Sequence, residues 1–173
     1  MNYSVVYTSK TGNTRKVAKA IFDNLPGENK EIQELSNYTD PEQSETWFVG
    51  FWINRGTSSL EMANFLSKLH GKNVALFATC GMGASKAYYS RLEAQMRALL
   101  PEDNICLGCY LCQGKMPIQV RKRYEEEQAE HPEDARYSMM IRNFDEAMLH
   151  PDAHDLEAAA AFARKTLERY ALC

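Results

Sequence analysis

Short apolar runs alternate along this chain with segments in which apolar residues recur every three or four positions. The apolar or alternating runs predict β-strands at residues 3–7, 31–35, 47–51, 74–78 and 105–112. The helical period predicts helices at residues 17–25, 58–69, 92–99, 137–148 and 156–170. Strands that alternate with helices predict an α/β fold whose parallel sheet is covered on both faces.

Five such strands fit a doubly wound five-stranded parallel sheet in the order 2-1-3-4-5, because right-handed crossovers leave few other topologies. The weakly alternating run 31–35 suits an edge strand. In this topology the ligand crevice lies beside strands 1 and 3, so we expect binding groups in the loops 8–14, 52–58 and 80–85. Ser58, followed by Glu61, predicts a capping box at the start of the helix after the third strand.

The length of 173 residues suits one domain, 1–173, in which residues 115–150 form an extra helical segment after the fifth strand. Within it, the basic run 121–123 stands four residues before the acidic run 125–127. That spacing is typical of a solvated helix face with weak ion pairs. The alternative is a segment that docks a partner.

The residues that join the first strand to the first helix, Thr8-Ser9-Lys10-Thr11-Gly12-Asn13-Thr14, carry the strongest chemical signal. Hydroxyl and backbone N–H groups at the positive end of a helix can bind a phosphate dianion, and a glycine lets the backbone approach closely. The run lacks the spacings GxxxxGK[ST] and GxGxxG, so it is neither a nucleoside triphosphate loop nor a dinucleotide fingerprint. The alternative is an ordinary turn capped by Thr11 or Asn13.

This segment resembles the FMN phosphate loop of the flavodoxin family, which is a hydroxyl residue, any residue and then Thr-Gly-Asn-Thr. The matching positions are Ser9, Thr11, Gly12, Asn13 and Thr14. The resemblance extends over residues 1–113 and the last helix. It implies a flavodoxin-like fold, one non-covalently bound FMN, and electron transfer between redox protein partners, a reductase and an acceptor enzyme. Residues 115–150 have no counterpart in the smallest flavodoxins.

The resemblance also implies that the loops after strands 3 and 4 enclose the isoalloxazine ring. An aromatic side chain in the first loop can stack on a flavin, which makes Trp52 the candidate; the alternative is a tryptophan packed in the core. Gly56 would permit the peptide rotation with which flavodoxins bind the reduced ring, and Thr57 would lie close to the ring or cap the next helix. The glycines after strand 4 permit a tight loop whose N–H groups reach the ring's carbonyl edge.

The usual flavodoxin tyrosine is absent from the loop after strand 4, so we expect Met82, Tyr88 or Tyr89 to cover the second face of the ring. The predicted cofactor-binding residues are Ser9, Lys10, Thr11, Gly12, Asn13, Thr14, Trp52, Asn54, Arg55, Gly56, Thr57, Cys80, Gly81, Met82, Gly83 and Ala84.

Arg55 makes the loop after strand 3 differ from the acidic ring surroundings typical of flavodoxins. A cation near the ring stabilises the anionic reduced flavin. We therefore expect a less extreme low potential than in acidic relatives. The alternative is that Arg55 points to solvent.

Composition limits the remaining function classes. A net charge of −3 argues against a partner such as nucleic acid or an anionic membrane. No apolar run approaches the ~20 residues of a membrane span, and the first residues do not resemble a signal peptide. Five cysteines, an odd number, do not suggest a secreted disulfide scaffold, so we expect a cytoplasmic protein.

Two groups of residues offer competing metal chemistry. Cys106, Cys109 and Cys112 have the spacing of an iron–sulfur run. On a regular strand, however, Cys109 faces away from the other two, so we expect small buried thiols instead. His150 and His154 are one helical turn apart, but the residues between them favour a helix start. We predict no metal site and no catalytic residue.

Three functions remain. We expect a flavodoxin-like electron carrier, in which the redox chemistry belongs to the flavin. The alternative is an FMN-dependent oxidoreductase that uses NAD(P)H, a quinone or a tetrapyrrole in a pocket over the ring, which residues 115–150 could build. A regulator of the CheY kind would need clustered acids after strand 1, and Thr8-Ser9-Lys10 has none. The oligomeric state is open.

Overall fold

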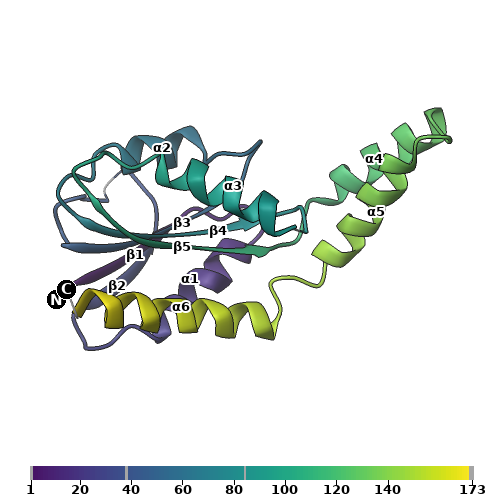
Figure 1. The fold of residues 1–173 in the computed structure, drawn as a ribbon. Helices are drawn as coiled ribbons and strands as arrows, with labels where there is room; N and C mark the ends of the chain where they lie inside the picture. Colours follow the sequence, from purple (N-terminus) through teal and green to yellow (C-terminus); the bar gives the residue numbers. More distant parts are fainter. Residues whose placement is uncertain (1, 38, 84, 172–173) are drawn as a thin grey trace.

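The computed structural model describes residues 2–37, 39–83 and 85–171. Its centre is a five-stranded sheet in the order β2-β1-β3-β4-β5, which confirms the predicted topology. The strands are β1 (Tyr3–Tyr7), β2 (Lys30–Glu34), β3 (Thr46–Trp52), β4 (Asn73–Cys80) and β5 (Ile105–Gln113). Neighbouring strands are parallel throughout, so their carboxyl ends share one edge, at the right of Figure 1.

Helices cover both faces of the sheet. On one face lie α1 (Asn13–Asp23) and α6 (Ala153–Ala171), and on the other lie α2 (Leu60–Leu66) and α3 (Lys86–Arg97) (Figure 1). Every residue of β1 is buried, and so are all but one residue of β3 and of β4. This burial explains why their sequences are continuously apolar, since a strand covered on both faces has no solvated side.

The two faces bury separate apolar clusters. Trp47, Phe51 and Met62 belong to the cluster under α2 and α3. Ile21 and Phe48 belong to the cluster under α1 and α6. Each of these side chains is fully buried and contributes about 1.5–3 kcal/mol through the hydrophobic effect.

The start of α2 differs by one residue from the sequence prediction. Ser59, not Ser58, is the N-cap, and its hydroxyl accepts a hydrogen bond from the Met62 N–H at 3.3 Å. Ser58 is buried, and its own hydroxyl donates to the Ser59 carbonyl at 3.1 Å. The predicted capping box is therefore wrong, because the Ser58 side chain is used before the helix begins.

The facing of the cysteines in β5 also differs from the prediction. Val74 pairs with Cys106 and Ala75 pairs with Gly108, so a bulge interrupts the alternation of side chains between the two faces. Cys109 packs against the cluster under α2 and α3 and hydrogen-bonds Cys106, whereas Cys112 belongs to the cluster under α1 and α6. The expectation that Cys106 and Cys112 share a face is therefore wrong. The three thiols still do not converge.

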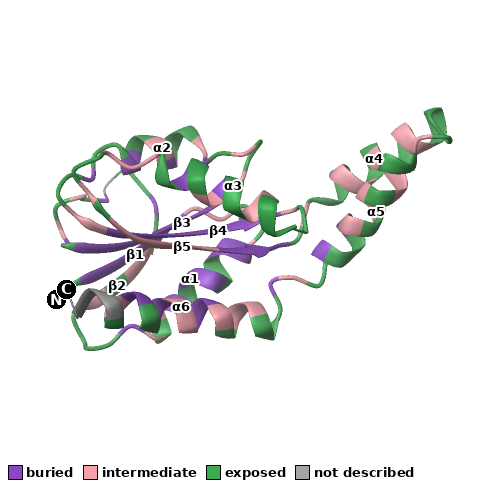
Figure 2. Ribbon diagram, viewed as in Figure 1, coloured by how far each residue is buried: buried purple, intermediate pink, exposed green. Residues whose placement is uncertain are grey.

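Residues 115–150 form a helical hairpin of α4 (Ile118–Glu130) and α5 (Ala135–Ala147). The hairpin extends from the carboxyl edge of the sheet and points away from it (Figure 1). The predicted helix 137–148 corresponds to α5. Figure 2 shows the hairpin mostly exposed or half-buried: α4 has no buried residue, and α5 buries only Phe144 and Ala147.

Within the part of the chain that the structure describes, no helix combines the length and the apolar character needed to cross a bilayer.

Candidate functional site

A pocket of about 290 Å³ lies at the carboxyl edge of the sheet, where the topology predicts ligand binding. Four segments meet there: the β1–α1 loop, the end of β3, the end of β4 and the connection from β5 to α4. It is lined by Lys10, Thr11, Asn13, Trp52, Ile53, Asn54, Thr79, Cys80, Gly81, Gly114, Lys115, Met116, Pro117 and Val120. The structure thus brings together residues from all three predicted loops.

The amino end of α1 is open toward a ligand. Its N-cap is Gly12, which has a φ of +83° and makes no side-chain capping bond, so neither Thr11 nor Asn13 caps the helix. Only a residue without a side chain adopts this left-handed conformation at little cost. Among the described residues, the buried Thr8 hydroxyl oxygen has no hydrogen-bond partner. Backbone N–H groups at this helix end are the groups that a bound phosphate would satisfy, whereas Thr8 does not line the pocket.

Three side chains in and beside this loop make hydrogen bonds that hold it in place. The Thr14 and Thr79 hydroxyls are 3.0 Å apart and buried, which joins α1 to the end of β4. The Asn13 amide donates to the Thr11 hydroxyl at 2.7 Å and to the Lys115 carbonyl at 2.9 Å. Ser9 accepts a bond of 3.3 Å from the backbone N–H of a residue in the first turn of α1.

Trp52 ends β3 with its side chain half-buried in the pocket wall, outside both core clusters. The Lys10 ammonium lies 5.7 Å from the centre of its ring, within cation–π range. An aromatic surface that faces a pocket and a cation is available to a planar ligand. This placement favours the stacking interpretation of Trp52 over the core interpretation.

Arg55 and Gly56 form the tip of a tight turn closed by hydrogen bonds between Asn54 and Thr57. Both have positive φ, +51° and +88°, as in a type I′ hairpin turn. Arg55 is exposed and, with Gly56 and Thr57, lies beside the pocket rather than in its wall.

The loop after β4 is held from outside by the α4–α5 hairpin. Asn143, on α5, accepts a hydrogen bond of 2.6 Å from the Gly83 N–H and donates one of 2.9 Å to the Gly81 carbonyl. Gln113 adds a bond of 3.2 Å to the same carbonyl. The Gly83 N–H is thus engaged by protein, and Gly83 and Met82 do not line the pocket. Ala84, also predicted, lies outside the described residues.

Another part of the wall comes from Gly114 and from four residues that the sequence prediction missed: Lys115, Met116, Pro117 and Val120. Met116 packs directly on Gly81, because a Cβ added to that glycine would lie 2.4 Å from the methionine sulfur. Tyr88 and Tyr89, the other candidates for the second face, pack against the core cluster instead. The position of 114–120 after the fifth parallel strand was the signal that could have identified this wall.

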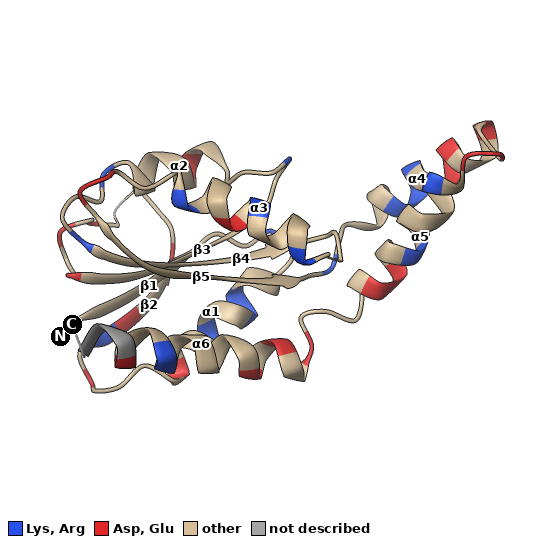
Figure 3. Cartoon of the chain, in the orientation of Figure 1, with Lys and Arg blue, Asp and Glu red and all other residues tan. Residues whose placement is uncertain are grey.

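The charge at the pocket is positive. Its lining contains Lys10 and Lys115 and, among the described residues, no Asp or Glu. Cys80 contributes a neutral thiol, because burial raises its pKa to about 11. Figure 3 shows that the acidic residues of the hairpin gather instead along α4 and α5 and in the connection at its far end.

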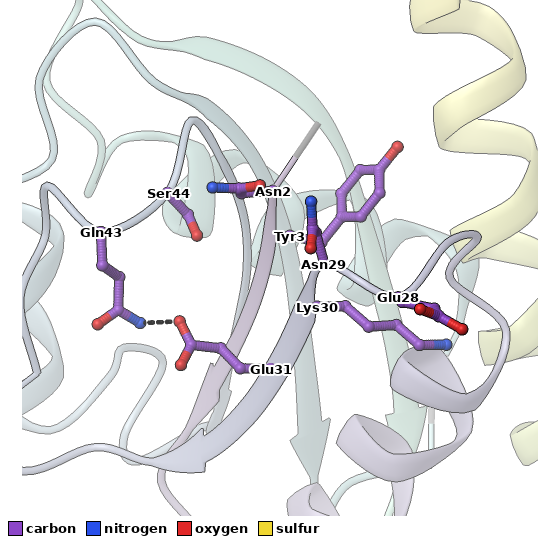
Figure 4. A pocket seen from close by; sticks show the side chains of 8 residues that line it. All are labelled: Asn2, Tyr3, Glu28, Asn29, Lys30, Glu31, Gln43 and Ser44. Carbon is purple, nitrogen blue, oxygen red and sulfur yellow. Dashed lines mark hydrogen bonds between the residues drawn. The ribbon is translucent and has the colours of Figure 1, made fainter.

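A second depression, of about 330 Å³, lies at the opposite, amino edge of the sheet (Figure 4). Several of its polar side chains already have partners: the Gln43 amide donates to the Glu31 carboxylate, which also accepts a 2.8 Å bond from Ser4. Lys30 donates to two backbone carbonyls at 2.7 and 3.0 Å. Because parallel α/β sheets bind ligands at the carboxyl edge, the first pocket is the better candidate.

His150, Asp152 and Asp155 lie close together, and their hydrogen bonds to one another explain why. Asp152 and Asp155 accept each other's backbone N–H at 2.9 Å, which is a reciprocal cap at the start of α6. Asp155 also bonds the His150 ring at 2.5 Å. The helix start predicted near Pro151-Asp152 is confirmed.

Comparisons with known proteins agree with this geometry. A family model described as a flavodoxin domain matches residues 4–164. Two relatives named flavodoxin-like domain-containing protein BilS are 31% identical (Clostridioides difficile, strain CD3) and 32% identical (Clostridium symbiosum, strain WAL-14163). The alignments cover 96% of this chain and 97% of the first relative, and 94% of both chains for the second.

Solved flavodoxins share the fold at low sequence identity. A flavodoxin from Streptococcus pneumoniae TIGR4 matches with a TM-score of 0.61 and 14% identity, over 98% of this chain and 99% of that one. A flavodoxin from the domain Archaea matches with a TM-score of 0.55 and 18% identity, over 98% of each chain. Together with the sheet order and the open helix end at its carboxyl edge, these matches show that the chain belongs to the flavodoxin family, whose cofactor is FMN.

Proposed function

We propose that this protein holds FMN in the carboxyl-edge pocket and carries electrons between a reductase and a partner redox enzyme. The observation that carries the proposal is one continuous pocket that joins the amino end of α1, whose N-cap glycine has no side chain, to an aromatic wall. Such a pocket suits a ligand with a phosphate at one end and a flat ring at the other. When bound, the flavin supplies the redox chemistry, and the protein supplies binding, orientation and charge.

The phosphate end of the proposed site is the β1–α1 loop. Backbone N–H groups after Gly12 and the hydroxyl of Thr11, which lines the pocket, would bind the phosphate, and Ser9 supports the loop through its bond to the first turn of α1. Thr14 and Asn13 act as positioning residues, because their bonds tie the loop to β4 and to the β5–α4 connection. At the ring end, Trp52 and Met116 both line the pocket and would contact the ring.

The cations at the pocket make the reduced cofactor more stable than an acidic site would. Lys10, Lys115 and the neighbouring Arg55 are all exposed. Their charge favours the anionic reduced ring. It also favours a redox partner whose docking face is acidic, since complementary charge accelerates association.

A carrier is favoured over an enzyme by the direction of the hairpin. The α4–α5 hairpin points away from the sheet (Figure 1), and of the described residues in its two helices only Val120 lines the pocket. Ile118 and Met148, at its base, are exposed and enlarge the apolar surface that a partner can cover. We assign the whole chain, residues 1–173, to one domain that carries this function. We also place the protein in the cytoplasm, where free thiols such as Cys80 and Cys112 persist.

The phosphate site is tested by comparing FMN with riboflavin, which lacks the phosphate. The apoprotein is expected to bind FMN much more tightly than riboflavin. Gly12→Ala, which forces a side chain into a left-handed backbone, is expected to lower FMN affinity and leave weak riboflavin binding unchanged. Gly27→Ala is the matched control, because Gly27 has a φ of +76° and equally open surroundings but lies away from the pocket.

Equal affinity for FMN and riboflavin, or equal losses in the two glycine variants, would reject the phosphate site. Direct oxidation of NADH by the holoprotein, with a quinone or ferric acceptor, separates carrier from enzyme. A carrier is expected to be slow until a reductase is added. Fast turnover by the protein alone would establish the oxidoreductase alternative.

A further inference from the structure

The amino half of β5 holds a pair of thiols that the proposed flavin site does not use. Gly108, with a φ of +152°, forms the bulge that places Cys106 and Cys109 on the same face of the sheet. The two thiols are hydrogen-bonded to each other, and each is only partly buried. On a regular strand, residues three apart would face opposite sides. The bulge therefore converts two separate cysteines into a dithiol.

A cation activates one member of this pair. Arg97, the last residue of α3, places its Nη1 3.0 Å from the Cys106 sulfur. The hydrogen bond from Cys109, with the Arg97 charge, lowers the pKa of Cys106 below that of an ordinary thiol, although partial burial opposes this. The pKa of Cys109 is raised, chiefly because it donates to Cys106. The pair thus has the asymmetry of an attacking thiolate and a resolving thiol.

The other two described thiols lack this activation. Burial raises the pKa of Cys80 to about 11 and that of Cys112 to about 12. Both sulfurs are therefore protonated near neutral pH and shielded from solvent. Among the four described cysteines, we expect only Cys106 to react in thiol–disulfide exchange, because the thiolate is the nucleophile in that reaction.

We propose that Cys106 and Cys109 form a reversible redox site that undergoes thiol–disulfide exchange with low-molecular-weight disulfides. The Cys106 thiolate attacks one sulfur of the small disulfide, forms a mixed disulfide, and releases the other half as a thiolate. Cys109 then loses its proton to solvent and attacks the Cys106 sulfur. This forms the Cys106–Cys109 bond and releases the second small thiolate. The two protein thiols are oxidised together, and the small disulfide is reduced to two thiols.

This site is spatially separate from the pocket. About seven strand residues, roughly 23 Å of extended chain, separate Cys106 from the carboxyl end of β5. The proposal therefore does not depend on FMN binding and can be tested with or without the cofactor.

The experiment treats the reduced protein with oxidised glutathione in the absence of oxygen, followed by intact-mass and peptide analysis. We expect the loss of two hydrogens, located in the peptide that contains both cysteines and reversed by dithiothreitol. Cys109→Ser is expected to accumulate a glutathione adduct on Cys106, and Cys106→Ser to remain unmodified in this peptide. Cys112→Ser is the matched control from the same strand and is expected to react like the wild type.

The pH profile of alkylation tests activation in the unmodified protein. We expect the alkylation midpoint of Cys106 to lie below that of a free thiol, and Arg97→Gln to move that midpoint upward. Alkylation of wild-type Cys106 with a midpoint near the ~8.5 of a free thiol would overturn the proposal. So would a stable glutathione adduct on the wild type without closure to the internal disulfide, or disulfides found only between two copies of the chain.

Discussion

Replacing Asn143 by alanine removes the side chain through which α5 holds the loop after β4. Two hydrogen bonds to the loop are lost, one of 2.6 Å from the Gly83 N–H and one of 2.9 Å to the Gly81 carbonyl, and a third, of 3.2 Å, is lost from the Gln113 amide. Each such bond contributes about 0.5–1.5 kcal/mol net, so the clamp contributes about 1–3 kcal/mol to the observed loop conformation. The change tests whether the hairpin outside the pocket sets the shape of the pocket itself.

The expected effect on FMN affinity follows from the populations of the clamped and open loop conformations. A difference of about 1–3 kcal/mol corresponds to about 5- to 150-fold in the ratio of clamped to open loops. If FMN binds the clamped loop, the dissociation constant rises by up to that factor when the clamp is removed. The assay is a titration of the apoprotein with FMN, followed by the quenching of flavin fluorescence.

The neighbouring variant Arg142→Ala is the matched control, because Arg142 lies on the same helix with its side chain exposed. Asn143→Asp keeps an acceptor for the Gly83 N–H but loses the donor to the Gly81 carbonyl, so an intermediate affinity is expected. Circular dichroism and thermal unfolding check that each variant keeps its fold. Unchanged or tighter FMN binding by a folded Asn143→Ala variant would refute the clamp as a determinant of the site.

Three further outcomes follow from single positions. Arg55→Asn is expected to stabilise the protein by up to about 1 kcal/mol in urea unfolding, because Asn tolerates the left-handed φ of +51° better than Arg; a loss of stability would contradict this. Lys115→Gln is expected to lower the midpoint potential of the bound flavin. The shift corresponds to about 0.5 kcal/mol, the Coulomb energy of two unit charges about 8 Å apart in water. Potentiometric titration measures this shift, and an unchanged potential would place the Lys115 charge too far from the flavin to affect it. The hydrogen bond to Asp155 raises the pKa of His150 above 6.5, so this pair stabilises the fold fully below that pH and loses its effect as the pH rises through the folded-state value. Asp155→Asn is expected to flatten that dependence in unfolding measured across neutral pH, and an unaltered slope would exclude the pair as its source.

The sequence by itself determined the sheet, its strand order and the place of the site. Continuous apolar runs identify buried strands such as β3 because both faces are covered, and parallel connections leave few topologies. The hydroxyl-rich run around Gly12 identifies a phosphate-binding helix end because its chemistry is local: the glycine, its neighbours and the helix lie within a few residues.

Only the tertiary structure decided what closes the pocket and which cysteines meet. The wall at Met116 and the clamp from Asn143 depend on contacts between segments far apart in the chain, which no periodicity encodes. The bulge at Gly108 reverses the facing of every later residue in β5, because side chains alternate with a period of two and one extra residue shifts them all. Local patterns therefore determined the framework, whereas the exact lining of the site and the pairing of Cys106 with Cys109 depended on how distant segments pack.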